Sequence, residues 1–117
     1  MGEYDAYLPH MDVNDGKTRV MNNLKLYTTL LGKFKSKEMM ADLVAAKDNN
    51  DNVKVAQVAH AIRGTAGNLG FPILHDVTSD IETLAKQGDD VSHLMDALAK
   101  AVDDLDAAIA AFTAASV

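Results

Sequence analysis

The C-terminal quarter of the chain carries an uninterrupted helical pattern of apolar residues. From residue 91 onward, apolar side chains recur every three or four positions, at Val91, Leu94, Met95, Leu98, Val102, Leu105, Ile109 and Phe112. This spacing places one apolar stripe along a helix, and the stripe must be buried against other elements. The same three-and-four spacing recurs upstream, and no stretch of useful length alternates as a strand does. The pattern predicts an all-α fold.

Residues that cap and break helices divide the chain into four long helices. Gly70 suits a helix C-terminus, and Pro72 suits the first turn of the helix that follows. Upstream, a polar connector covers residues 47–52, and Asp51 or Asn52 can cap the next helix. The expected long helices cover residues 24–47, 53–69, 72–87 and 90–115.

Four long helices with short connectors predict an antiparallel four-helix bundle. A length of 117 residues suits one domain, so residues 1–117 are expected to form a single unit. Gly32 predicts a bend in the first long helix. Ahead of the bundle, residues 1–11 with Pro9 are expected as an N-terminal arm, and residues 12–21 as a short extra helix.

Charge and composition argue against several classes of partner and chemistry. The formal net charge is −6, whereas proteins that bind nucleic acid or anionic membrane surfaces present basic patches. The chain has no cysteine, so disulfides and thiolate chemistry are excluded. The longest apolar run, residues 107–112, is too short to span a bilayer, and the N-terminus lacks the layout of a secretory signal. We therefore expect a soluble, cytoplasmic domain with neither nucleic acid nor membrane as its partner.

A histidine in the second long helix is predicted to point away from the core. The apolar stripe of this helix consists of Val55, Val58, Ile62, Ala66 and Leu69. At about 100° per residue, His60 lies roughly 150–160° from the centre of that stripe. Gly64 and Gly67 follow at i+4 and i+7 on the same face. Each glycine costs about 1 kcal/mol relative to alanine inside a helix, so we expect this pair to give a partner access to the imidazole.

The charges near His60 in the sequence favour an incoming anion. Arg63, at i+3, is the only lysine or arginine between residues 55 and 85, and residues 55–75 contain no carboxylate. A guanidinium can grip phosphate oxygens through several N–H groups. An imidazole is mostly neutral near pH 7, because its ordinary pKa is about 6.5. His60 is therefore a candidate nucleophile toward phosphorus.

Two other kinds of site use the same residue types. The remaining histidines, His10, His75 and His93, do not stand three or four residues from another histidine, so the sequence predicts no metal site. The run from Gly64 to Gly67 fits the GxxG clamp of nucleic-acid-binding KH domains by its letters. The acidic charge and the absence of strands argue against that assignment.

The stretch from His60 to Gly70 resembles the signature of histidine phosphotransfer (HPt) domains. In that signature a histidine is followed by two residues, a lysine, a glycine and then small residues up to a glycine. The resemblance covers about residues 12–115 and implies that His60 accepts a phosphoryl group through Nε2. It implies that Arg63, at the usual lysine position, steadies this group and that Gly64 leaves room for a receiver domain. Further residues implied to line the same docking surface are Gln57, Gly67 and Asn68.

The resemblance also implies the kind of function. Such a domain is a phosphocarrier without kinase or ATPase activity of its own, and a transient phosphohistidine links two receiver domains in a phosphorelay. The implied partners are receiver domains of response regulators or a hybrid sensor kinase, with Mg²⁺ supplied by the receiver and no cofactor in this chain. The alternative is a non-catalytic helical module that docks receivers without carrying phosphate.

Overall fold

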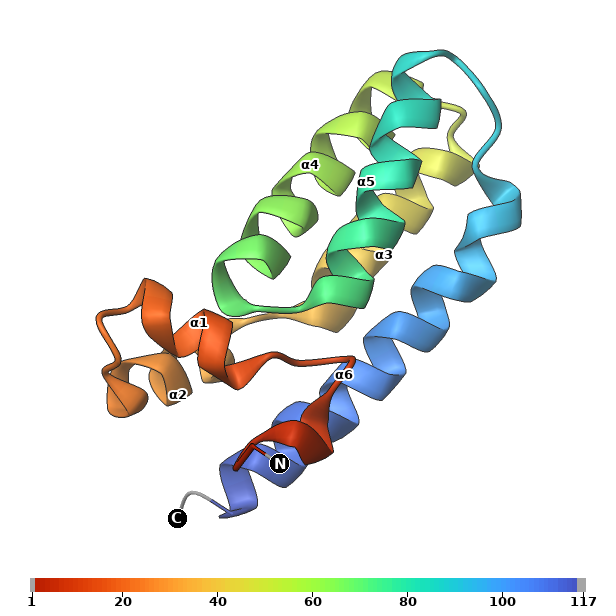
Figure 1. Ribbon diagram of the computed structural model, residues 1–117. Helices are drawn as coiled ribbons and strands as arrows, with labels where there is room; N and C mark the ends of the chain where they lie inside the picture. Colours follow the sequence, from red (N-terminus) through yellow and green to blue (C-terminus); the bar gives the residue numbers. More distant parts are fainter. Residues whose placement is uncertain (1, 116–117) are drawn as a thin grey trace.

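The structure, a computed structural model that describes residues 2–115, has helices and no strands within that range. Four helices, α3, α4, α5 and α6, lie antiparallel as a bundle, while α1 and α2 pack at one end of it (Figure 1). The elements in chain order are η1 (Asp5–Tyr7), α1 (Val13–Arg19), α2 (Leu24–Lys33), α3 (Ser36–Asp48), α4 (Asn52–Leu69), α5 (Pro72–Lys86), η2 (Ser92–Leu94) and α6 (Met95–Ala115). The predicted all-α bundle is confirmed. Residues 1 and 116–117, which the predicted domain includes, lie outside the described range.

The predicted helix over residues 24–47 is wrong as a single element, because it is divided into α2 and α3. Phe34 has extended backbone angles, with φ −77° and ψ 115°, so the helix ends instead of bending near Gly32. The ring of Phe34 packs against Phe71 at 5.2 Å between centroids. The Ser36 hydroxyl donates to Asp106 of α6 at 2.7 Å. These contacts hold both sides of the break against the bundle, and glycine weakens the last turn of α2.

The predicted helix over residues 90–115 begins later than expected. At its predicted start, the Asp90 carboxylate accepts hydrogen bonds from the Ser92 backbone N–H and hydroxyl. Residues Ser92–Leu94 form η2, a short 3₁₀ turn, and α6 begins only at Met95. At the other end of the chain, Tyr4 and Tyr7 pack their rings edge-on against Phe112 of α6. The expected N-terminal arm therefore lies along the C-terminal half of α6 (Figure 1).

Helix α4, which carries His60, begins and ends as its sequence predicts. The Asp51 carboxylate caps its N-terminus by accepting from the Lys54 N–H at 3.0 Å. Gly70 follows its last residue with φ +78°, a left-handed conformation that favours glycine. Pro72 then starts α5. The predicted helices 53–69 and 72–87 thus match α4 and α5 within one residue at each end.

The N-terminal helices fix the C-terminal end of α4. The buried Tyr27 hydroxyl of α2 donates to the Leu69 carbonyl at 2.7 Å, and the Asp12 N–H donates to the Gly70 carbonyl at 2.6 Å. Gly16 of α1 lies so close that a Cβ there would stand 2.4 Å from the Leu69 oxygen and 2.5 Å from Tyr27 Cε1. These hydrogen bonds satisfy carbonyls that a helix end leaves free.

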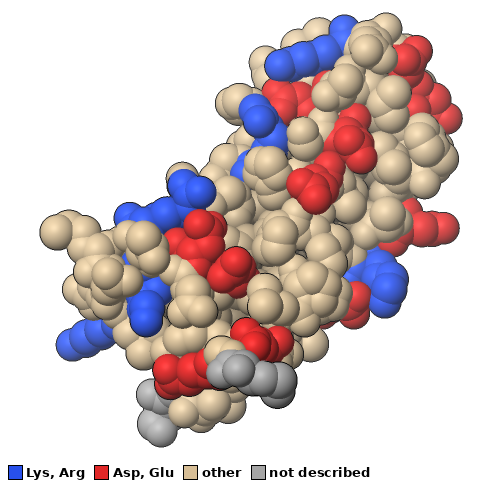
Figure 2. Space-filling view, viewed as in Figure 1, with Lys and Arg blue, Asp and Glu red and all other residues tan. Residues whose placement is uncertain are grey.

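Two features of the described residues bear on the molecule's environment. None of the helices within residues 2–115 combines the length and the apolar character needed to cross a bilayer. Positively and negatively charged side chains are interspersed on the face shown in Figure 2. On α6, Asp103 and Asp106 pair with Lys37 of α3, which joins these two helices across the bundle.

Candidate functional site

His60 lies on the exposed face of α4, as the sequence predicts. Its side chain is 64% exposed, while Ala59 and Ile62 beside it are buried in the core. Because α4 packs against both α3 and α5, a broad strip of its surface is buried. The imidazole therefore stands at the edge of the α4–α5 interface, with one side against α5 and the other toward solvent.

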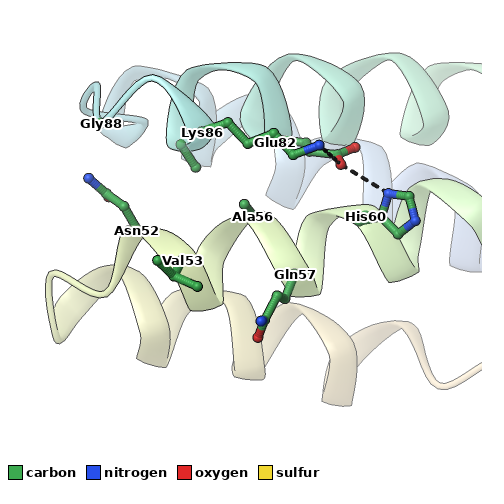
Figure 3. Close-up of a pocket in the computed structure, with 9 residues that line it drawn as sticks. Asn52, Val53, Ala56, Gln57, His60, Glu82, Lys86 and Gly88 are labelled. Atoms are coloured by element: carbon green, nitrogen blue, oxygen red, sulfur yellow. Dashed lines mark hydrogen bonds and ion pairs between the residues drawn. The ribbon is translucent and has the colours of Figure 1, made fainter.

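A carboxylate from α5 lies directly beside the imidazole. Glu82 Oε2 stands 2.9 Å from His60 Nδ1, and the Glu82 side chain is only 7% exposed. Figure 3 shows this contact bridging the two helices, with the other ring nitrogen of His60 turned away from α5. A buried carboxylate in hydrogen-bonding distance of one ring nitrogen orients the ring.

The neighbours of Nδ1 determine which ring nitrogen of His60 carries the proton. Arg63 Nη2 also approaches Nδ1, at 3.1 Å, but a guanidinium can only donate hydrogen bonds. The Glu82 carboxylate can only accept them, so Nδ1 cannot satisfy both neighbours at once. Glu82 is closer, and a proton on Nδ1 turns its 2.9 Å contact into a hydrogen bond to a charged group. Neutral His60 therefore carries its proton on Nδ1, which leaves the Nε2 lone pair free.

Two cations share the Glu82 carboxylate with His60. Arg63 Nε lies 2.8 Å from Oε1 as an ion pair without hydrogen-bond alignment, and Lys86 Nζ lies 2.9 Å from Oε2. Burial alone would raise the pKa of Glu82. The hydrogen bonds from Lys86 and His60 and the charge of Arg63 outweigh burial, so the pKa of Glu82 lies below its usual value. Glu82 is therefore ionised at neutral pH.

These contacts correct the expected charge environment of His60. The sequence places no carboxylate within residues 55–75 and one cation within residues 55–85, but α5 adds both Glu82 and Lys86 to the site. Arg63 is consequently not an unpaired cation that faces solvent. It lies 35% exposed between the imidazole and the Glu82 carboxylate.

The other predicted site residues lie on the same side of α4 but differ in exposure. Gly64 is exposed, and a Cβ there would meet nothing within 4 Å. Gly67 is half-buried, since a Cβ would stand 3.5 Å from the His75 ring of α5. Gln57 and Asn68 are exposed on either side of His60 along the helix. The open approach to the imidazole is therefore centred on Gly64.

Two hollows flank this exposed face. A groove of about 730 Å³ runs between α4 and α5 from His60 toward the turn at Gly88 (Figure 3). Val53, which is 70% exposed, lines it together with Ala56 and Ala85. The second hollow, of about 460 Å³, lies between α4 and the α2–α3 break and has Leu30, Lys33, Phe34, Lys35, Met39, Thr65, Asn68 and Leu69 as its lining. His60 thus lines one end of the first groove, while Thr65 and Asn68 of the same helix line the second hollow.

The remaining histidines lie apart from this site. His10 Nε2 is 3.8 Å from Asp104 on α6, and His75 Nδ1 is 3.3 Å from Asp76. His93 is exposed in η2. Within residues 2–115, no three histidine or carboxylate side chains gather in a way that could hold a metal ion.

The fold agrees with comparisons to known proteins. Residues 33–111 match the model of the Hpt domain family. The chain belongs to the Hpt domain family. Hpt domains are phosphocarriers of two-component phosphorelays and interact with receiver domains and kinases.

A solved structure supports the fold independently. It is the Hpt domain of a sensor hybrid histidine kinase from Shewanella, with a TM-score of 0.69 and 18% sequence identity. The similarity covers 86% of this chain and 88% of the Shewanella domain. At 18% identity the match supports the fold and nothing further. A comparison with curated protein sequences gives no significant match.

Glu82 and Lys86 are the site residues that sequence reasoning missed. A signal for Glu82 was present, because it lies between buried positions of α5 at Thr78, Ile81 and Ala85. A carboxylate on the buried side of a helix needs a partner. The i,i+4 spacing of Glu82 and Lys86 identifies one partner, but the contact with His60 depends on how α4 and α5 pack.

Proposed function

We propose that His60 carries a phosphoryl group between aspartates of receiver domains. The observation that supports this most directly is the orientation of the imidazole, with Nδ1 held by Glu82 and Nε2 facing solvent. A nucleophile that is 64% exposed at the end of an open groove is accessible to another protein's active site.

The proposed transfer follows from this orientation. The Nε2 lone pair attacks the phosphorus of a receiver's aspartyl phosphate, so a P–N bond forms while the P–O bond to the aspartate breaks. The aspartate leaves as a carboxylate, and the imidazole gains positive charge. The ionised Glu82 stabilises that charge through the Nδ1–H. Reversal of these steps on a second receiver passes the group on.

The remaining predicted residues have proposed roles in docking. Gly64 presents no side chain, so a receiver's active site can approach Nε2 closely. Gln57 and Asn68 extend the contact surface along α4, and Arg63 is proposed to turn toward the phosphoryl oxygens in the complex with a receiver. Mg²⁺ belongs to the receiver in this proposal, and the chain contributes positioning and charge.

The test is incubation with purified, phosphorylated receivers from the same organism. We expect acid-labile label on this chain, its transfer to a second receiver and its complete loss in His60→Gln. Because His60 is 64% exposed, the variant should keep its fold, which circular dichroism can check. Labelling of an intact His60→Gln protein by a receiver would overturn the assignment.

The same experiment separates the alternative, a docking module without phosphotransfer. Such a module would bind a receiver in a calorimetric titration and remain unlabelled. The free Nε2 and the ionised Glu82 behind the ring favour transfer, because docking alone requires neither.

A further inference from the structure

We infer that Lys86 is a second phosphoryl-binding residue, which exchanges its ion pair with Glu82 for one with the phosphoryl group on His60. The inference rests on the proposed function, because it assigns a role toward the group that His60 would carry. Lys86 lies at the end of α5, outside the stretch around His60 that carries the Hpt resemblance. It reaches the site only through the packing of α5 on α4 (Figure 3).

Arg63 alone gives the site no surplus positive charge, because Glu82 is paired with it. Arg63 and Glu82 have opposite charges and are in contact, so together they leave no net charge beside a neutral imidazole. Lys86 supplies the surplus positive charge of the cluster. Lys86 therefore adds one positive charge to the site that a phosphoryl dianion on Nε2 would meet.

The geometry places the ammonium close to the reacting ring. Glu82 Oε2 contacts both His60 Nδ1 and Lys86 Nζ at 2.9 Å, so a single oxygen atom separates the two nitrogens. Arg63 Nε contacts the other carboxylate oxygen, Oε1, at 2.8 Å. The two cations thus lie against different oxygens of Glu82, and Lys86 has to swing its side chain from Oε2 toward Nε2 to reach a phosphoryl group there.

Lys86 is also the more exposed of the two cations. Its side chain is 65% exposed, compared with 35% for Arg63, and it has a flexible four-carbon stem. Besides Glu82 and His60, the side chains lining this end of the groove are uncharged, so little competes for the ammonium. A phosphoryl group carries more negative charge than a carboxylate, which favours the exchange. Glu82 keeps the Nδ1–H of His60 when Lys86 leaves.

The inference can be tested without a receiver. Potassium phosphoramidate phosphorylates histidines chemically, and the ³¹P signal absent from His60→Gln identifies the phosphoryl group on His60. The pKa of this group, read from a ³¹P titration, reports nearby positive charge, because a cation favours the dianion. In Lys86→Gln we expect this pKa to rise by about half a pH unit, in line with a solvent-exposed ion pair.

Two matched variants separate a local effect from a general one. Lys86→Arg keeps the charge, so its titration should stay near that of the wild type. Lys100→Gln removes a comparable i,i+4 pair, with 3.0 Å between Lys100 Nζ and Asp104 Oδ2, on α6 away from the site. It should leave the ³¹P titration unchanged.

Each outcome bears on the inference separately from the proposed function. A rise in Lys86→Gln alone supports it. An unchanged pKa of the phosphoryl group in Lys86→Gln overturns it. A rise of the same size in Lys100→Gln or in Lys86→Arg would also overturn it. Failure of receivers to exchange phosphate with His60 would instead count against the proposed function. The titration would still report on Lys86 in that case.

Discussion

Replacement of Gly64 by alanine should stabilise the fold while impairing phosphotransfer. Gly64 lies inside α4, and an added Cβ would meet nothing within 4 Å. The new methyl group therefore replaces no contact and creates no clash in the isolated domain. It stands, however, one helical turn from His60 on the face that a receiver must approach.

The magnitude follows from helix propensity. Alanine is favoured over glycine by about 1 kcal/mol inside a helix, so the free energy of unfolding should rise by up to this amount. For a domain of this size the melting temperature should rise by roughly 4 °C. Transfer depends on the approach of two reacting atoms, and a displacement of the receiver by a methyl group should slow it about tenfold or more.

Urea unfolding and single-turnover transfer from a phosphorylated receiver measure the two effects separately. Chemical labelling by phosphoramidate should remain near the wild-type rate, because the small reagent can pass the methyl group. The matched control is Gly16→Ala, whose Cβ would stand 2.4 Å from the Leu69 carbonyl oxygen. That variant should lose about 2 kcal/mol of stability through overpacking.

Two results would refute this reasoning. A Gly64→Ala protein less stable than the wild type would mean that Gly64 is not in open space. A stabilised protein that receives phosphate at the wild-type rate would mean that receivers do not approach over Gly64, and the docking surface would have to be reassigned.

Three further predictions concern the ion pairs of Glu82, the hydrogen bond from Tyr27 to the end of α4, and the groove between α4 and α5. Glu82→Gln should lower stability at neutral pH by about 1–2 kcal/mol in urea unfolding. The folded-state pKa of Glu82 lies below its ordinary value near 4.5, so the difference in unfolding free energy between the wild type and Glu82→Gln should shrink as the pH falls from 4.5 through the folded-state pKa. A difference at pH 3 as large as that at neutral pH would contradict this prediction. Tyr27→Phe should lose about 1–2 kcal/mol with its buried hydrogen bond to Leu69, and an unchanged urea midpoint would argue against that bond. Val53→Asp, at a 70% exposed position in the groove, should keep its stability but slow receiver transfer severalfold, whereas equal transfer rates would exclude the groove from docking.

The sequence predicts well what depends on short-range pattern. The face that holds His60 follows from the apolar spacing of one helix, and the ends of α4 follow from Asp51, Gly70 and Pro72. These are local preferences, because each depends on neighbours within about one helical turn. The outward direction of His60 could therefore be predicted before any packing was known.

What depends on contact between helices could not be predicted in the same way. Glu82 is 22 residues from His60 in the chain, so their contact depends on the rotation and register of α5 against α4. The break between α2 and α3 is similar, since Phe34 turns toward Phe71 and Ser36 bonds to Asp106, both distant in sequence. A continuous apolar spacing fits one long helix as well as two short ones, and these tertiary contacts determine which forms.

The hydrogen bonds that close the C-terminal end of α4 affect where the functional unit begins. Asp12, Gly16 and Tyr27 all precede residue 33, where the match to the Hpt family begins. A fragment trimmed to the matched residues would keep His60, Arg63 and Glu82 but leave the Leu69 and Gly70 carbonyls without these donors. Amide hydrogen exchange in the last turns of α4 should be faster in such a fragment than in the full chain. The smallest unit that includes the contacts closing the C-terminal end of α4 is therefore larger than the segment that identifies the family.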